Sequence, residues 1–417
     1  MSNVWYQEIT RDNWKTLLAS WLGWALDGLD FVLITYVLTD ISKQFHISLT
    51  IASTLILATF ATRWLGGAVV GSVLDRIGRK NAMILGVLIY SVATFLCGLS
   101  WSYWSLLVFR LFVGIGMAGE YAAGSTLLLE NWPERVRNKA SGFLVSGWAV
   151  GGLLASVVYS IIVPNFGWRA LFFVGIVPAL LTLFIRFGVS ESEEWTKSRA
   201  EHDKPQGVSF FQLFTKKWFP IAFIMFLFMF ASFGMNWPVL GLMPTYLKGI
   251  GYNPAGIGEI MFISNFGALL GYWFSGFLAD RIGFRLASVL TLLASLVFLV
   301  LAFSTAHSSS LITMGIFMFF LEFTNLGISG LWPYYITQHF DVDVRSSGLG
   351  FTYNLGAIAG GLSPVWGSAL KSSIGLGGAI ASLTFFWTII LTLIIAFNVA
   401  GRVKNRKLQL TELSKSY

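Results

Sequence analysis

Long apolar stretches recur along the whole chain and are separated by short polar segments. Twelve of these stretches approach the length of about 20 apolar residues that a helix needs to cross a lipid bilayer. They lie at 17–38, 51–74, 82–100, 103–128, 141–163, 168–189, 218–246, 256–279, 286–306, 309–336, 347–370 and 376–399. The pattern predicts an all-α integral membrane protein with twelve transmembrane helices.

One longer polar segment divides the twelve predicted helices into two groups of six. It covers residues 190–217 and is rich in charged side chains. We therefore expect an N-terminal six-helix bundle over 1–189, a cytoplasmic central loop over 190–217 and a C-terminal six-helix bundle over 218–417.

The positive charges favour one orientation in the membrane. With an even number of spans both termini share a side, and Lys and Arg concentrate on the cytoplasmic side of membrane proteins. If the termini are cytoplasmic, most of the 28 Lys and Arg residues are cytoplasmic too. The exceptions are Lys43, Arg169, Lys248 and Lys371 outside, and Arg63 and Arg110 within helices. The net charge of +8 is thus a topology signal and indicates no nucleic-acid partner.

Two loop sequences repeat between the halves. The run Gly-Ser-Val-Leu-Asp-Arg-Ile-Gly-Arg-Lys at 71–80 is echoed by Gly-Phe-Leu-Ala-Asp-Arg-Ile-Gly-Phe-Arg at 276–285. A second echo relates Arg137, Gly142 and Phe143 to Arg345, Gly350 and Phe351. Parallel repeats of this kind place a substrate site between the halves, near the middle of the bilayer.

Composition narrows the function further. Charged residues make up 12% of the 417, about half the usual share in a soluble protein, and 55% are hydrophobic. The single cysteine, Cys97, excludes a disulfide framework, and the four histidines form no metal cluster. We find no cofactor motif and expect neither a cofactor nor a metal. A membrane enzyme or a sensor stays as the alternative from another class.

The loop at 71–80 resembles the signature loop of the major facilitator superfamily. The match falls on Gly71, Asp75, Arg76, Gly78, Arg79 and Lys80. In that superfamily the loop latches the halves on the cytoplasmic side. The resemblance therefore implies a gating role for Asp75, Arg76 and Arg79, and for Asp280 and Arg281 in the second copy.

Several helices resemble those of the sialate:proton symporter family. The matching runs are 25–31, 63–67, 110–121, 132–133, 137–144, 167–173 and 348–354. The resemblance implies import of sialic acid with protons across a bacterial inner membrane by alternating access. Some members have two additional helices in the central loop, which this chain lacks. A carrier of this design needs only one chain, so we expect a monomer in the lipid bilayer.

Ionisable residues inside the predicted helices are candidates for function because burying a charge in a bilayer is costly. These are Asp27, Asp30, Arg63, Arg110, Glu120 and Glu322. Asp27 and Asp30 are three residues apart, so both can face one interior. Two neighbouring carboxylates in low dielectric resist joint ionisation, which favours proton uptake by one of them.

Arg110 is the expected counter-charge. The region of Asp30 and that of Arg110 also resemble the sugar porters, in whose proton-coupled members an acid on helix 1 pairs with an arginine on helix 4. This implies that Asp30 and Arg110 form a proton switch, in which protonation frees Arg110 to bind a substrate carboxylate. The alternative is a permanent ion pair that holds the two helices together.

Two other charged residues, Arg63 and Glu120, each allow two interpretations. Arg63 lies on a small-residue face with Gly67 and Gly71, so it can bind a substrate carboxylate bidentately or bridge to a neighbouring helix. Glu120 lies between Gly116 and Gly124. It can bond a neighbouring helix or take part in proton transfer.

The second half offers milder polar groups for a substrate. Glu322, Asn325 and Ser329 follow a helical spacing, and Ser232, Asn236, Trp237, Tyr353 and Asn354 come from two other helices. These groups suit a polyhydroxylated sugar acid, but they can equally be hydrogen bonds between helices. We expect most of the numerous remaining Trp and Phe side chains to face lipid or its interface, and we assign them no role.

Three further charges lie at cytoplasmic helix ends. Glu130, Arg137 and Arg345 resemble the superfamily's inter-helix salt-bridge network, so we expect them to balance inward and outward states. Within transporters, the alternative substrate is another organic anion, such as a monocarboxylate or a hexuronate, because buried arginines do not choose among anions.

Overall fold

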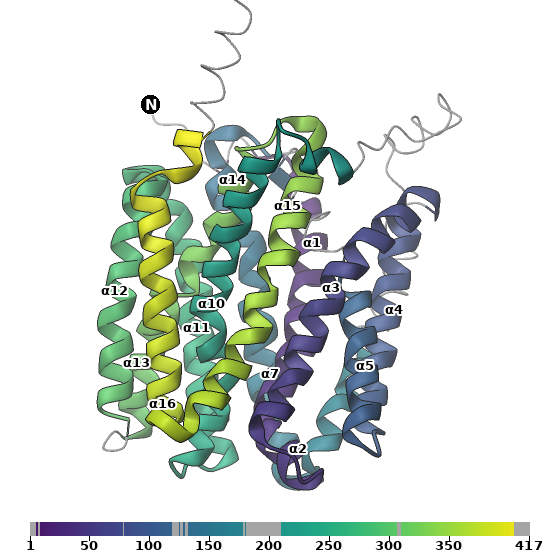
Figure 1. Ribbon diagram of the computed structural model, residues 1–417, viewed down its shortest axis with the longest axis vertical. Coiled ribbons are helices and arrows are strands. Elements are labelled where there is room, and N and C mark those ends of the chain that lie inside the picture. The colour runs from purple at the N-terminus through teal and green to yellow at the C-terminus, as the bar shows by residue number, and fades with distance from the viewer. Residues whose placement is uncertain are drawn as a thin grey trace, which may run out of the picture.

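The computed structural model describes residues 9–77, 79–118, 132–177, 210–306 and 310–403, together with positions 6, 125, 128, 129 and 180. Within these ranges the regular structure is helical and contains no strand. In the first half the helices are α1 (Arg11–Leu33), η2 (Ile34–Tyr36), α2 (Leu38–Gln44), α3 (Leu49–Ile77), α4 (Arg79–Gly98), α5 (Tyr103–Gly116), η3 (Glu134–Val136), α7 (Arg137–Phe173) and η4 (Val174–Ile176). The N-terminus and the last described helical turn lie at the same end of the bundle, opposite α2 (Figure 1).

The second half is built in the same way. Its helices are η5 (Phe210–Phe214), α10 (Phe219–Gly249), α11 (Pro254–Ile282), α12 (Phe284–Ser304), α13 (Leu311–Thr324), η6 (Gly327–Leu331), α14 (Trp332–Thr337), α15 (Val342–Gly356) and α16 (Ile358–Ala396). The halves meet along two seams, where α7 packs on α11 and α3 packs on α16.

The described helices agree with twelve spans. Seven segments are long and apolar enough to cross a membrane, and three shorter apolar helices accompany them. Two of the seven, α7 and α16, turn back on themselves at Gly167 and Gly375, whose φ angles of 77° and 71° suit glycine. Counting each of these as two spans gives the predicted twelve. The division at 190–217 falls mostly outside the described residues and stays a prediction.

Several predicted helices have different boundaries in the structure. The first begins at Arg11 instead of 17, because Thr10 caps its N-terminus by accepting a hydrogen bond from the backbone N–H of Asn13. The tenth is not continuous over 309–336, because α13 ends at Thr324 and a 3-10 segment follows. The eleventh is split between α15 and α16 at Ala357.

The outer surface is apolar, as lipid contact requires. Along α12 a stripe of exposed aliphatic side chains follows the helical spacing. It consists of Leu286, Leu290, Leu293, Val297 and Val300, each at least 45% exposed. Because a water-soluble surface rarely carries so continuous an apolar stripe, this face fits the hydrocarbon of a bilayer.

Glycines bring α1 and α7 into backbone contact. A Cβ atom on Gly151 would lie 2.3 Å from the carbonyl oxygen of Ala25, and one on Gly28 would lie 2.9 Å from that of Trp148. Small residues allow this close approach between membrane helices. The packing fixes α1, which carries the two buried aspartates, against a rigid neighbour.

We expect Gly151→Ala to destabilise the protein, because its methyl group would overlap the backbone of α1. Overpacking of this kind costs about 1–3 kcal/mol, which should lower the melting temperature in detergent by several degrees. The matched control is Gly378→Ala, where the nearest atom would be an ordinary 3.6 Å away, on Ile374. Equal melting temperatures for the two variants would show that the α1–α7 contact is not tight.

Candidate functional site

A narrow cavity lies at the centre of the molecule, between helices of the two halves. It measures about 50 Å³, which is room for only a few water molecules. Aromatic rings form most of its wall, namely those of Trp24, Phe60, Trp148, Phe233, Trp237, Tyr272, Trp332 and Tyr353. The polar lining residues are Arg63, Ser232, Asn236 and Ser329. One cation in an aromatic enclosure suits an anionic ligand.

Arg63 on α3 brings that positive charge to the cavity. Its side chain is 1% exposed, and its Nη2 atom lies 3.8 Å from Oδ2 of Asp27. The guanidinium carbon lies 5.3 Å from the ring centroid of Trp24 and 5.7 Å from that of Tyr353, both within cation–π range. Among the described residues, no hydrogen-bond partner reaches its Nε or Nη2 atom. The cavity therefore holds a buried guanidinium whose Nε and Nη2 groups are available to donate hydrogen bonds to a ligand.

Asp30 and Arg110 form a second charged group, apart from the cavity lining. Both side chains are fully buried. The Nε–H of Arg110 donates to Oγ1 of Thr59 at 3.1 Å, and its guanidinium carbon lies 5.6 Å from the ring centroid of Phe31. Asp30 lies within electrostatic reach of Arg110 and beside Thr94. In the described part of the chain, no ion pair within 4 Å joins the two.

The structure thus gives each aspartate its own arginine. The sequence left open whether Asp27 and Asp30 share one interior, and it offered Arg110 as their counter-charge. Here Asp27 faces Arg63 at the cavity, whereas Asp30 faces Arg110 inside the first half. Arg110 does not line the described cavity.

The predicted substrate residues divide into two sets. Arg63, Asn236, Trp237 and Tyr353 line the cavity. The others are buried but lie outside its lining, and they are Arg110, Glu322, Asn325 and Asn354. The amide nitrogen of Asn354 donates to the carbonyl of Ala118 at 3.5 Å, so this side chain bridges between the halves.

Glu322 and Asn325 mark a break in the tenth span. Glu322 is in the last turn of α13, and Asn325 caps its C-terminus. Both side chains are almost completely buried, and within the described residues one carboxylate oxygen of Glu322 and both amide atoms of Asn325 find no hydrogen-bond partner. A polar group at such a break leaves room for rearrangement of this span.

Three tryptophans of the cavity escaped the sequence analysis. We expected most of the remaining Trp and Phe side chains to face lipid or its interface, whereas Trp24, Trp148 and Trp332 are only 3%, 7% and 2% exposed and line the cavity. The rings of Trp24 and Trp148 contact each other, with centroids 5.3 Å apart. The available signal for Trp24 was its position three residues before Asp27, on the same side of the helix.

Four of the predicted gating residues are described, and they lie at the ends of α7, α11 and α15. Asp280 on α11 accepts a hydrogen bond from the amide of Asn138 at 2.9 Å and pairs with Lys139. Arg137 donates its Nε–H to the carbonyl of Trp132 at 3.1 Å. Arg281 is exposed in the last turn of α11, and Arg345 lies in the first turn of α15.

The remaining candidates fall on residues whose side chains the structure does not describe. They are Asp75, Arg76, Arg79, Glu120 and Glu130. Their roles stay predictions.

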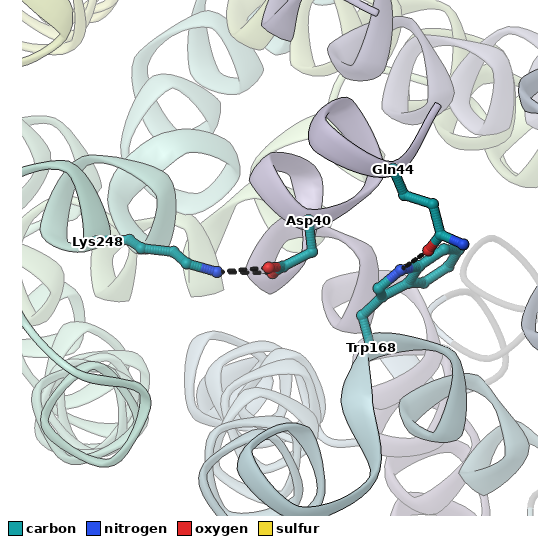
Figure 2. A network of polar contacts seen from close by, with 4 residues as sticks. All are labelled: Asp40, Gln44, Trp168 and Lys248. Atoms are coloured by element: carbon teal, nitrogen blue, oxygen red, sulfur yellow. Dashed lines mark hydrogen bonds and ion pairs between the residues drawn. The ribbon is translucent and has the colours of Figure 1, made fainter. Parts of the chain in front are cut away.

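At the opposite end of the bundle the short helix α2 joins the halves. Its Asp40 pairs with Lys248 on α10, whose Nζ atom lies 2.7 and 2.8 Å from the two carboxylate oxygens (Figure 2). One turn further on, Gln44 accepts a hydrogen bond from the indole N–H of Trp168 at 2.6 Å, and a second from Arg169. The helix is therefore held to α7 of its own half and to α10 of the other.

Comparison with known proteins places the fold in a family. The profile of the Major Facilitator Superfamily matches residues 20–364. The sialic acid transporter NanX of Escherichia coli K12 is 39% identical over 97% of this chain and 98% of its own. The cis,cis-muconate transport protein of Acinetobacter baylyi is 29% identical over 92% and 95%. A D-xylose-proton symporter structure superimposes with a TM-score of 0.73 at 18% identity, covering 92% of this chain and 97% of that one.

The chain belongs to the Major Facilitator Superfamily. It is a multi-pass membrane transporter and not an enzyme.

Loss of the Asp40–Lys248 pair should ease opening at the α2 end. A partly exposed pair is worth roughly 0.2–1 kcal/mol, so Lys248→Gln should speed labelling of a Thr245→Cys reporter by an impermeant maleimide about two- to fivefold. Cys97 is the single native cysteine, so Cys97→Ser provides the background. The combined reversal, Asp40→Lys with Lys248→Asp, should restore slow labelling. Unchanged labelling in both single and double variants would rule the pair out as a latch.

Proposed function

We propose that this transporter imports sialic acid, N-acetylneuraminate, together with protons across a bacterial inner membrane. The observation that carries the proposal is Arg63, a buried guanidinium with unused donors in the wall of a central cavity. The 39% identity to a sialic acid transporter over almost the full length supports the choice of anion. We further propose cytoplasmic termini and a monomeric carrier.

In this proposal Arg63 binds the substrate carboxylate. A guanidinium presents two parallel N–H groups to a carboxylate, which gives direction as well as strength. Asn236 contributes a buried amide oxygen to which no described residue donates a hydrogen bond, and it suits a hydroxyl or N-acetyl N–H of the sugar. Trp237 and Tyr353 provide apolar faces for the ring and its substituents.

The cavity must widen before such a ligand fits. Sites for ligands of this size usually have several hundred Å³, against about 50 Å³ here. Glu322, Asn325 and Asn354 lie beyond the present lining. We propose that movement of the halves brings them to the enlarged site.

Proton coupling is assigned to Asp30 with Arg110. Both are buried away from the cavity, so a proton on Asp30 changes the charge balance within the first half without touching the substrate. A neutral Asp30 no longer attracts Arg110 electrostatically, so α1 and α5 can shift relative to each other. We keep Glu120 as a further proton-coupling candidate.

Alternating access then depends on closure at two ends. The contacts of Asp280 with Asn138 and Lys139 close the end that carries the termini, which we assign to the cytoplasm. We assign the other gating roles there to Asp75, Arg76, Arg79, Glu130, Arg137, Arg281 and Arg345. The pair of Asp40 and Lys248 closes the opposite, periplasmic end.

A second candidate substrate is another organic anion. The aromatic wall favours it, because flat rings stack on a planar carboxylate such as the muconate named for one relative. Arg63 would bind the carboxylate in the same way. Competition between N-acetylneuraminate and planar acids distinguishes the two candidates.

Uptake of radiolabelled N-acetylneuraminate into proteoliposomes tests the proposal. We expect accumulation that requires an inward proton gradient in the wild type. Asp30→Asn should reduce gradient-driven accumulation while allowing exchange of substrate across the membrane, because the site remains but the proton of Asp30 is no longer carried. Arg63→Gln should weaken binding about tenfold or more, as loss of a charge-assisted hydrogen bond costs roughly 1.5–3 kcal/mol.

Two results would contradict parts of this assignment. Uptake that ignores the gradient would refute proton coupling and leave the substrate in place. A folded wild type that takes up no N-acetylneuraminate, but does take up a planar acid, would replace the substrate.

A further inference from the structure

Asp27 holds the position on Arg63 that a substrate carboxylate needs. Its Oδ2 atom lies 3.8 Å from Nη2 of Arg63, too far for a hydrogen bond yet close enough for an ion pair. Rings of Trp24 and Tyr353 occupy two further sides of the guanidinium. A carboxylate that enters the cavity therefore meets an arginine whose charge is already balanced by an internal anion.

We propose that Asp27 is an internal stand-in for the substrate carboxylate, which the substrate displaces from Arg63 and which then takes up a proton. This inference rests on the proposed function and deepens it, because it assigns a role to the second aspartate of α1. In the exchange, the substrate anion replaces the Asp27 carboxylate at Arg63, and one proton from solution neutralises the displaced Asp27. The charge of the site is the same before and after.

The surroundings of Asp27 make this exchange specific. The charged and titratable groups that face it include Arg63 from α3 and the phenol of Tyr353 from α15. Asp30 follows on α1 itself, next to Arg110. From α7 this stretch of α1 meets the backbone of Trp148 and Gly151, which cannot titrate. A carboxylate displaced in so apolar a setting is stabilised by protonation.

The exchange also explains selectivity for anions. A neutral sugar cannot replace the charge of Asp27 at Arg63, so its binding would leave the original ion pair in the way. An anionic ligand compensates Arg63 fully. Asp27 thus selects anionic over neutral ligands, in addition to taking up a proton.

The test compares two substitutions on the same helix, Asp27→Asn and Asp30→Asn. Binding of N-acetylneuraminate to the purified protein is measured by calorimetry between pH 5 and 9, in buffers of different ionisation enthalpy. If binding takes up one proton at Asp27, the dissociation constant rises about tenfold per pH unit in the alkaline range. We expect Asp27→Asn to lower that slope by one and to tighten binding at the alkaline end. Asp30→Asn should keep the Asp27 contribution.

Asp27→Glu provides a second measurement, in case the amide variant does not fold. The longer acid should keep the proton uptake and change the affinity only. Weaker binding by a folded Asp27→Asn, similar to that of Arg63→Gln, would overturn the proposal and place Asp27 among the groups that hold the substrate. An unchanged proton count would overturn it as well.

The design separates this inference from the proposed substrate. Nicotinate, gentisate and cis,cis-muconate are measured beside N-acetylneuraminate. If one of them binds with the Asp27-dependent proton uptake while N-acetylneuraminate does not bind, the substrate is wrong and the exchange stands. If N-acetylneuraminate binds without any Asp27-dependent proton uptake, the substrate stands and the exchange is refuted. Absence of binding by all four acids would refute both.

Discussion

A charge inside a bilayer must be balanced nearby, and two aspartates on α1 show how this constraint organises the transporter. Three residues of helix turn the second side chain by about 60° and raise it by about 4.5 Å. Asp27 therefore faces Arg63 on α3 at the cavity, whereas Asp30 faces Arg110 on α5 inside the first half. One helix, packed closely on α7, connects the proposed substrate site to the proposed proton site.

Ion pairs join the two halves at both ends of the bundle. At one end Lys139 pairs with Asp280, and at the other Lys248 pairs with Asp40. The Asp40–Lys248 pair is partly exposed, so it contributes no more than about 1 kcal/mol. The tight backbone contacts between α1 and α7 are instead within one half. The seam between α7 and α11 is just as close, since a Cβ atom on Gly142 would lie 2.3 Å from the carbonyl oxygen of Tyr272. Movement of the halves must therefore separate a tight backbone contact as well as the ion pairs at the two ends.

Features that follow from composition could be predicted from the sequence. The direction in which a side chain points around its helix could not. The length of the apolar stretches identified the membrane spans. Arg63 and Asp27 were identified because charged residues are rare within those spans. Spacing alone could not say that Asp27 and Asp30 face different arginines, because a difference of 60° is compatible with a shared face. Nor could it separate Trp24 and Trp148 from lipid-facing tryptophans, since both environments are apolar. The break after Thr324 did have a signal in the sequence, because Gly327, Gly330 and Pro333 follow closely, but we took the whole stretch as one span.

Arginine suits this site because its planar guanidinium can bind a carboxylate through two parallel N–H groups. In the proposed exchange one carboxylate replaces another at Arg63, so the proton is taken up by the displaced carboxylate and the charge of the guanidinium does not change. The rings of Trp24 and Tyr353 come from different halves, so the surroundings of Arg63 are complete only when the halves are close together. We expect movement that opens the cavity to take one ring away from the guanidinium and so to expose its N–H groups to an incoming carboxylate. Binding of the anion to Arg63 can in this way compensate for the cation–π contact that is lost when the cavity opens.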